Sequence, residues 1–120
     1  MFCTLISNCF GQKDSTIYTV VQEMPEFPGG PSEMMRYIQA NVNYPKEEKK
    51  AGISGKCFIK FVVEIDGSIS HVTVLKGVKD GPNCDKEALR VIESMPKWSP
   101  GKQNGRPVRV YYNVPISFRL

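Results

Sequence analysis

Few side chains of the types that carry enzyme chemistry occur in this sequence, and they are scattered. His71 is the only histidine among the 120 residues, which excludes histidine-based catalytic triads and metal sites with several histidine ligands. The four cysteines form no Cys-x-x-Cys motif, so neither a zinc site nor dithiol redox chemistry is indicated. Glu64 and Asp66 fall on one phase of a predicted strand, but Asp66 belongs to a turn signal. The sequence therefore predicts no catalytic site, metal or cofactor, and we do not expect an enzyme.

The two cysteines outside the N-terminal segment, Cys57 and Cys84, allow two interpretations. An oxidising compartment would permit a bridge between them, which would contribute about 3–4 kcal/mol by closing a loop. Cys57, however, alternates with the core-facing residues of a predicted strand, where a free cysteine behaves as a small apolar side chain. Two buried, unpaired thiols are therefore the favoured state.

The last predicted strand offers a different kind of chemistry, carried by its main chain. Pro115 lies inside this strand, where proline is tolerated only if the position of its missing N–H faces a free edge. In an antiparallel strand, alternate residues direct N–H and C=O to the same side, so Arg109, Tyr111 and Asn113 share the side of Pro115. A row left unpaired over about three residues is a template for an added strand from a partner. The alternatives are an edge that stays solvated and an edge that pairs with a second copy.

Two helices and three strands are predicted to position this edge. The first helix begins at Pro31, has apolar residues at four-residue spacing, and ends before Tyr44. The charged stretch Lys46–Lys50 is interpreted as a solvated turn. A strand over 57–65, apolar on both faces, follows and is expected to be central in its sheet.

The hairpin signal Asp66-Gly67 leads to a returning strand over Ile69–Leu75. A second helix is then predicted, with Asn83 or Asp85 as its N-cap and Pro96 as its stop. The last strand follows the turn signals after this helix and continues to the C-terminus. The apolar stripe of the second helix consists of Ala88, Leu89, Ile92 and Met95.

The topology follows from the hairpin and from the handedness of crossovers. The hairpin makes the first two strands antiparallel neighbours, and a right-handed crossover places the third strand on the far side of the first. We therefore predict an α+β fold of order αββαβ, with a three-stranded antiparallel sheet of order 2-1-3 and two helices on one face. A chain of 120 residues with 41% apolar and 23% charged residues suits a single globular domain of this kind.

The N-terminal segment is predicted to lie outside the domain, which we expect to span 32–120. Residues 1–12 carry no charge and are similar to a truncated remnant of a secretory signal peptide; an apolar start of a cytosolic protein and a lipidated Cys9 are the alternatives. Residues 13–31 form an extended arm rich in proline and glycine, in which the β-prone segment 17–21 could dock as a short strand.

Several short motifs together resemble the C-terminal domain of TonB. The resemblance covers about residues 20–120, and its combined motifs are specific although each alone is weak. The motifs are Tyr44-Pro45, Gly52-Ile53 with Gly55, Asp66-Gly67-Ser68-Ile69, Glu87-Ala88-Leu89, Met95-Pro96-Lys97-Trp98 with Pro100-Gly101-Lys102, and Phe118 in the closing strand.

The resemblance implies a periplasmic module that grips the TonB box of an outer-membrane TonB-dependent transporter by β-strand addition, in energy-coupled transport of nutrients. In the family the guest segment pairs with the last strand, and the neighbourhood of the Tyr-Pro motif also approaches the transporter. The partners implied are the transporter and inner-membrane motor proteins, with a homodimer as a further possibility. The residues implied for partner binding are Tyr44, Pro45, Arg106, Arg109, Val110, Tyr111, Tyr112 and Asn113.

The sequence departs from the family pattern at two places. The glutamine that precedes the Tyr-Pro motif in the family is absent, since Val42-Asn43 stand before Tyr44. The membrane helix and proline-rich spacer of a full-length TonB are also not found, so coupling to a motor is implied by the family alone. The alternative function is a periplasmic adaptor or structural protein of the same fold that is not energised and binds another envelope protein or itself.

Two further features allow more than one interpretation. Lys102, Arg106, Arg109 and Arg119 surround the edge and either attract an acidic partner or keep the edge from pairing wrongly. Trp98 is interpreted as a lid on the core rather than as a ligand platform. Nucleic-acid binding is not expected, because a net charge of +4 is mild and the aromatic residues do not alternate with basic residues on one face.

Overall fold

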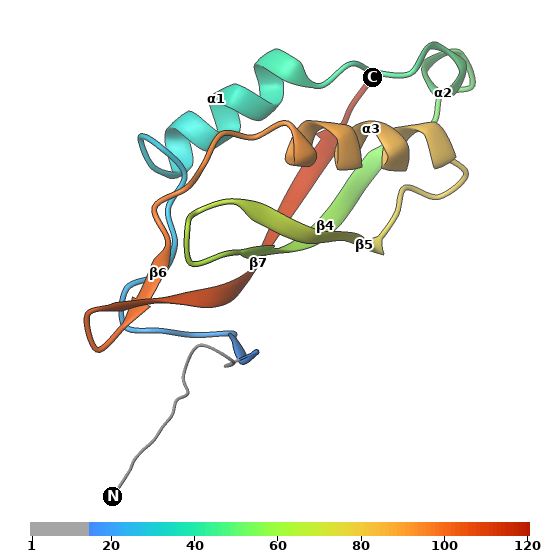
Figure 1. The fold of residues 1–120 in the computed structure, drawn as a ribbon. Coiled ribbons are helices and arrows are strands. Elements are labelled where there is room, and N and C mark those ends of the chain that lie inside the picture. Colours follow the sequence, from blue (N-terminus) through green and yellow to red (C-terminus); the bar gives the residue numbers. More distant parts are fainter. Residues whose placement is uncertain (1–14) are drawn as a thin grey trace, which may run out of the picture.

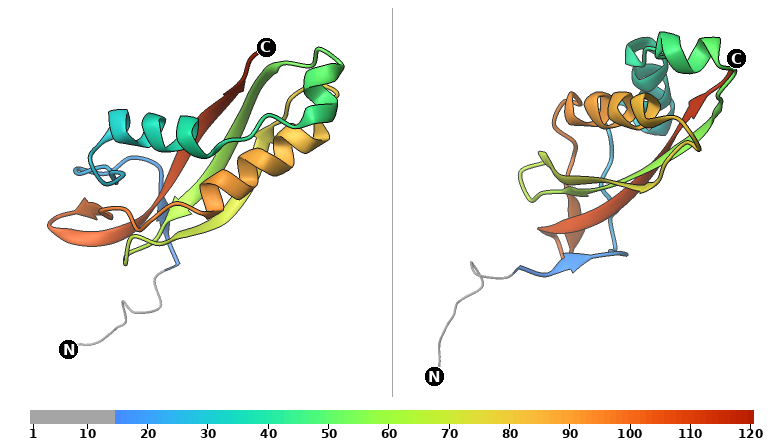
Figure 2. Two further views of the ribbon diagram at one scale, coloured as in Figure 1. Left: turned by 90° about the horizontal axis from the view of Figure 1, so that it is seen from above. Right: turned by 90° about the vertical axis from the view of Figure 1, so that its right-hand side faces the viewer.

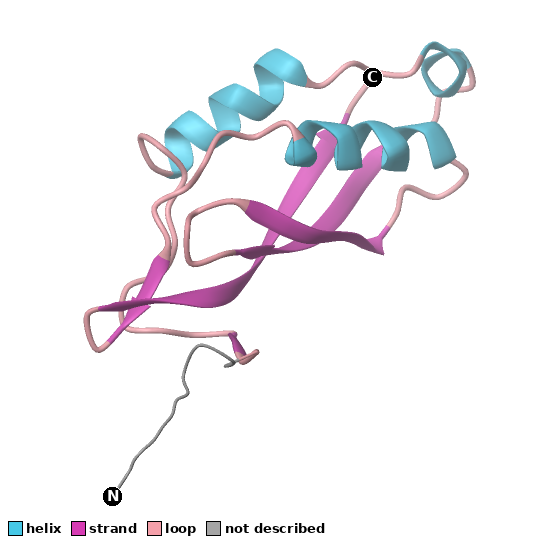
Figure 3. Cartoon of the chain, viewed as in Figure 1, coloured by secondary structure: helices cyan, strands magenta, loops and turns pink. Residues whose placement is uncertain are grey.

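The computed structural model describes residues 15–120, so the predicted signal-peptide remnant and Cys9 lie outside the described residues. Helices cover one face of a twisted sheet, and the opposite face, which we call the open face, carries none of the described helices (Figure 1, Figure 3). The elements of the described part are β3 (Ile17–Tyr18), α1 (Pro31–Asn41), α2 (Lys46–Lys50), β4 (Gly55–Val63), β5 (Ile69–Lys76), α3 (Pro82–Glu93), β6 (Gly101–Gln103) and β7 (Arg106–Phe118).

The sheet contains the predicted arrangement and more. Strands β5, β4 and β7 are antiparallel neighbours in that order, which is the predicted order 2-1-3. The predicted counts of three strands and two helices are wrong, because β3 pairs with β7 in parallel, β6 pairs with β7 in antiparallel, and a third helix, α2, is present. Strand β3 lies in the β-prone segment 17–21, whose docking as a short strand is confirmed, whereas β6 is only three residues long, too short to give a periodic signal in the sequence.

Strand β4 is central because it is apolar on both faces over its second half. Phe61, Val62 and Val63 have no exposed surface, although their side chains alternate between the two faces of the sheet. Ile65, which continues the same phase, lies beyond the strand in the hairpin turn and is 57% exposed. The core therefore follows the pattern predicted for β4 up to Val63 and not beyond.

Helix α3 begins without the predicted side-chain caps. Gly81 is its N-cap residue, and neither Asn83 nor Asp85 caps the helix. Asp85 instead accepts a hydrogen bond from the Val78 N–H at 2.9 Å. The Asn83 N–H is satisfied from another helix, by the carboxylate of Glu48 in α2 at 2.8 Å.

The interpretation of Lys46–Lys50 as a solvated turn is wrong. This segment is α2, and its Glu48 is only 3% exposed although both neighbouring residues are exposed. Burial is the largest single effect on Glu48 and raises its pKa, but the hydrogen bonds from Asn83, Cys84 and the main chain together outweigh it and lower the pKa, so the carboxylate is charged at neutral pH. A negative charge at the N-terminus of α3 also stabilises that helix.

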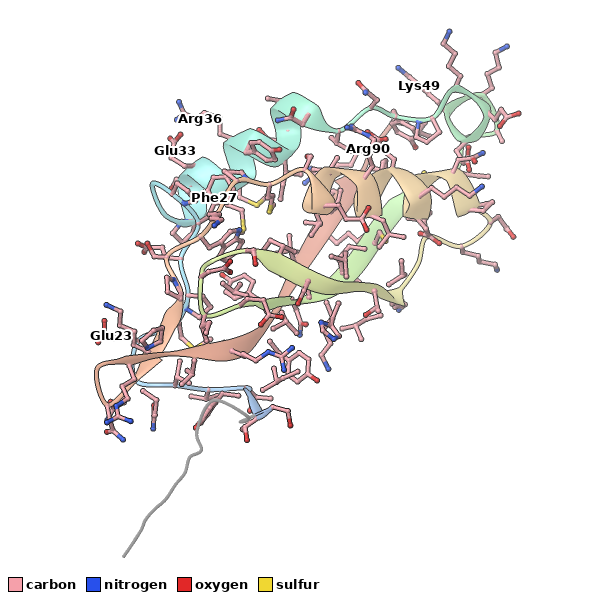
Figure 4. The ribbon with its side chains drawn as sticks, viewed as in Figure 1. Glu23, Phe27, Glu33, Arg36, Lys49 and Arg90 are labelled. Carbon is pink, nitrogen blue, oxygen red and sulfur yellow. The ribbon has the colours of Figure 1, made fainter. Side chains whose placement is uncertain are left out.

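The arm that precedes α1 packs against the end of the domain near β6. Glu23 pairs with Lys102 and Glu26 pairs with Ser99 through backbone hydrogen bonds of 2.8–3.1 Å. Phe27 is 6% exposed and belongs to the hydrophobic core, between the arm and α1 (Figure 4). The arm from Glu23 onward is therefore held to the folded domain by main-chain pairs and by one buried aromatic side chain.

The buried thiols Cys57 and Cys84, which are unbridged as favoured by the sequence, are expected to make the domain less stable at alkaline pH. Burial, with a smaller contribution from the nearby Asp85, raises the pKa of Cys57 to about 12. Burial, with a smaller contribution from the charge of Glu48, raises the pKa of Cys84 to about 11. The unfolded chain releases these protons near the ordinary thiol pKa of 9.0, whereas the folded chain keeps them, so the free energy of unfolding falls from about pH 9 upward.

Urea unfolding between pH 8 and 11 measures this loss. A variant with both Cys57→Ala and Cys84→Ala should be less stable at every pH but should show a flatter decline above pH 9. An equally steep decline in the double variant would show that the thiols do not cause the effect.

Candidate functional site

The outer side of β7, facing away from β4, is identified by its prolines. Phe58 of β4 pairs with Pro115, which has no N–H to donate, so the main-chain groups of Pro115 point away from β4. By alternation the groups of Asn113 and Ser117 point the same way. Strand β6 pairs with the same side of β7 as β4 does. Pro107, opposite Lys102, also lacks an N–H, so its main-chain groups point away from β6, just as those of Pro115 point away from β4.

The outer side is not unpaired along its whole predicted length. Strand β3 pairs with it in parallel, with Ile17 opposite Arg109 and Tyr18 opposite Val110. The prediction of a row left open at Arg109 is therefore wrong, since the β-prone segment of the arm reaches back to that position. In the part of the chain that the structure describes, no strand pairs with the outer side from Asn113 to Ser117.

The side chain of Arg109 is engaged within the chain. Its Nε and Nη2 donate to the two carboxylate oxygens of Glu64 at 2.7 and 3.1 Å, and its Nη1 donates to the Ser15 carbonyl at 3.2 Å. The hydrogen bond from Arg109 is the main cause that lowers the pKa of Glu64. Arg109 thus ties the segment before β3 to the end of β4, and it is not free to meet a partner.

Arg106 lies at the same end of the molecule as Arg109. Both line a cleft of about 690 Å³ between β3 and the β6–β7 hairpin, together with Tyr18 and Gln103. This cleft is remote from the open stretch of β7 that begins at Asn113. The two arginines that the resemblance implied for partner binding therefore sit beside β3.

Helix α1 crosses the C-terminal half of β7 (Figure 2). A second hollow lies there, beside the open stretch of β7. We call it the α1–β7 groove. Its volume is about 400 Å³. It is lined by Met35, Ile38, Gln39, Val42, Tyr44, Pro115, Ser117, Phe118 and Arg119.

Tyr44 forms part of the wall of this groove in a fixed position. Its hydroxyl donates a hydrogen bond to the Ile53 carbonyl, and its ring packs edge-on against Phe118 with 5.7 Å between centroids. Burial raises the pKa of the Tyr44 hydroxyl, so it stays neutral. Tyr44 therefore presents a ring rather than a free hydroxyl to the groove, and Pro45 follows it at the start of α2.

The remaining predicted residues divide between the two faces of the sheet. Val110 is fully buried, and the partly buried ring of Tyr112 packs against Trp98 with 4.9 Å between centroids, so both side chains lie on the helical face of the sheet. Tyr111 lies on the open face, where Lys60 Nζ sits 3.9 Å from its ring centroid. Asn113 is exposed at the beginning of the open stretch.

Sequence reasoning did not find the residues that α1 brings to the groove. Met34 and Ile38 are 7% and 3% exposed, as their four-residue spacing predicts, whereas Met35 is 42% exposed. An apolar residue outside the buried stripe of a short helix was the available signal. Its significance depended on β7 passing beside α1, which no local pattern reveals.

Comparisons with known proteins agree on one family. The model of the family described as Gram-negative bacterial TonB protein C-terminal matches residues 40–120. Two solution structures of the TonB C-terminal domain of Helicobacter pylori are similar in fold. One has a TM-score of 0.54 at 24% identity, covering 72% of this chain and 89% of its own. The other has a TM-score of 0.56 at 25% identity, covering 78% and 86%. No curated protein matches this chain.

Proposed function

Because this chain belongs to the TonB C-terminal domain family, a non-enzymatic family of the Gram-negative periplasm, we propose that it binds the TonB box of an outer-membrane transporter. The guest segment adds as a strand to the outer side of β7. The observation that supports this most directly is the stretch from Asn113 to Ser117, whose outward main-chain groups meet no strand within residues 15–120. The proposed contact begins four residues further along β7 than Arg109, and of the expected residues of this strand it keeps Asn113.

The role that follows is energy-coupled transport of nutrients across the outer membrane, with inner-membrane motor proteins as further partners. Within the described residues no helix has the length and hydropathy of a membrane span. In this role the described residues bind the transporter segment. About four main-chain hydrogen bonds at ~0.5–1.5 kcal/mol each sum to roughly 2–6 kcal/mol before ordering costs, so a free peptide binds in the millimolar to high micromolar range.

Replacing Asn113 by proline is expected to weaken binding of a TonB-box peptide at least tenfold. The substitution removes an N–H on the outer side of β7 while leaving the groups that pair with β4 in place. Asn113→Ala is the matched control, since it also removes the side chain but keeps the N–H. Titration of the isotope-labelled protein by NMR measures both affinities, and in the unsubstituted protein the largest amide shifts should fall between Tyr111 and Ser117.

Equal affinities of the Asn113→Pro and Asn113→Ala variants would contradict strand addition at this edge, provided that both melt at similar temperatures. Sedimentation of the free protein tests the alternative of self-pairing. A dimer that Asn113→Pro abolishes and the peptide does not disperse would assign this edge to a second copy of the chain instead.

A further inference from the structure

The α1–β7 groove adjoins the edge to which the guest strand is proposed to add. Pro115 and Ser117 belong to both, because their main-chain groups face outward and their atoms line the groove. A strand placed on this edge would lie about 4.8 Å from β7 and would pass along the mouth of the groove. Its side chains would alternate between the open face of the sheet and the helical face, so every second one would point toward α1.

The lining of the groove is suited to an apolar side chain. Its lining residues include the apolar or aromatic Met35, Ile38, Val42, Tyr44 and Phe118. Met35 is 42% exposed at the wall formed by α1, and an unbranched methionine can adapt to guest side chains of different shapes. Arg119 is the one charged residue of the lining, and its positive charge favours an acidic residue at that end of the guest.

The helical wall of the groove lies outside the part of the chain that defines the family. The family match begins at residue 40, whereas α1 spans Pro31–Asn41 and contributes Met35, Ile38 and Gln39. A surface formed by α1 can therefore differ among proteins that share the matched domain. Main-chain pairing alone is nearly independent of sequence, and pockets for alternate side chains supply selectivity in strand addition.

We propose that the α1–β7 groove is a selectivity pocket, which accepts an aliphatic or aromatic side chain of the guest strand and so decides which extended segments this chain binds. The inference rests on the proposed function, because it requires a guest strand on the outer side of β7. In this proposal the main-chain groups of Asn113–Ser117 provide the affinity for the guest strand. Met35 and its neighbours discriminate between the side chains of different guests.

A set of capped peptides of the form Thr-X-Thr-X-Thr-X, with X as Leu, Ala or Asp, tests the pocket without fixing the register. All X side chains lie on one face of the added strand, and a shift of one residue exchanges this face with the threonine face, so the peptide presents an X side chain to the groove in every second register. We expect the Leu peptide to bind about tenfold more tightly than the Ala peptide and more tightly than the Asp peptide, because only one end of the groove carries a positive charge. NMR titration should show shifts at Met35 and Val42 with the Leu peptide only.

The protein variant that tests the wall is Met35→Glu, and its matched control is Leu75→Glu on β5, where the leucine is 55% exposed. Both place one carboxylate at an exposed apolar position, so both should keep the melting temperature within a few degrees. Met35→Glu should weaken the Leu peptide about tenfold and leave the Ala peptide nearly unchanged, whereas Leu75→Glu should change neither.

The two proposals fail in distinguishable ways. If Asn113→Pro weakens all three peptides but Met35→Glu changes none, strand addition stands and the selectivity pocket is wrong. If Asn113→Pro has no effect on any peptide, strand addition at this edge is wrong, and the pocket, which depends on it, is wrong as well.

Discussion

Replacing Gly67 by alanine is expected to lower the free energy of unfolding by about 2 to 5 kcal/mol, from the left-handed backbone and the clash together. Gly67 lies in the β4–β5 turn with a φ of 87°, which side chains rarely adopt. A Cβ at this position would lie 2.0 Å from the Trp98 carbonyl oxygen. The turn cannot move away freely, because the Gly67 carbonyl accepts a hydrogen bond from the Trp98 N–H at 2.8 Å.

Gly105→Ala is the matched control for this prediction. Gly105 lies in the β6–β7 turn with a φ of 77°, but a Cβ there would meet nothing within 4 Å. Only the backbone cost of about 1–2 kcal/mol applies. Urea unfolding followed by tryptophan fluorescence compares the two variants. Equal losses of unfolding free energy would show that the contact with Trp98 adds no cost at Gly67.

Trp98→Ala is expected to destabilise the domain by about 3–5 kcal/mol, the usual cost of deleting a buried aromatic side chain. Trp98 is 3% exposed and packs against three rings, with centroid distances of 5.8 Å to Phe27, 5.5 Å to Phe61 and 4.9 Å to Tyr112. Because Phe27 belongs to the arm, the loss should also loosen the arm. Hydrogen exchange at the Glu26 and Ser99 amides, which pair with each other's carbonyls, reports that loosening.

Trp98→Phe separates ring packing from the indole N–H. The Nε1 atom of Trp98 is buried and has no hydrogen-bond partner among the described residues, so its removal leaves no acceptor unsatisfied. The phenylalanine variant should therefore lose less than half as much stability as the alanine variant. A loss as large as that of Trp98→Ala would mean that the indole makes a polar contact on which the fold depends.

The central part of the fold could be predicted because each of its signals is local. The alternation in β4, the Asp66-Gly67 turn and the Pro31 start of α1 each depend on a few neighbouring residues, and the structure confirms all three. The identification of Trp98 as a core lid is confirmed in the same way. Pro115 also indicated correctly which side of β7 faces away from its neighbour.

The failures concern contacts between segments far apart in the sequence. Glu48 stabilises α3 through Asn83, 35 residues away, so no signal near Asn83 could reveal it. The pairing of β3 with Arg109 likewise depends on the course of the arm around the domain. The residues of the candidate site differ from the predicted ones for the same reason. Arg109 is held by Glu64, and one wall of the α1–β7 groove comes from α1.

The two-residue pairing of β3 with β7 has a mechanical consequence for a chain held at both ends. Tension applied from the N-terminal side, against a guest anchored on β7, would act first on the Ser15–Arg109 hydrogen bond and on the pairs at Ile17 and Tyr18. Their separation would free residues 15–20, a segment of about 20 Å when fully extended. Only then would the force reach the buried Val21, the hydrogen bonds of Gln22, and the pairs at Glu23 and Glu26, so the arm would lengthen before the sheet carried any of the strain.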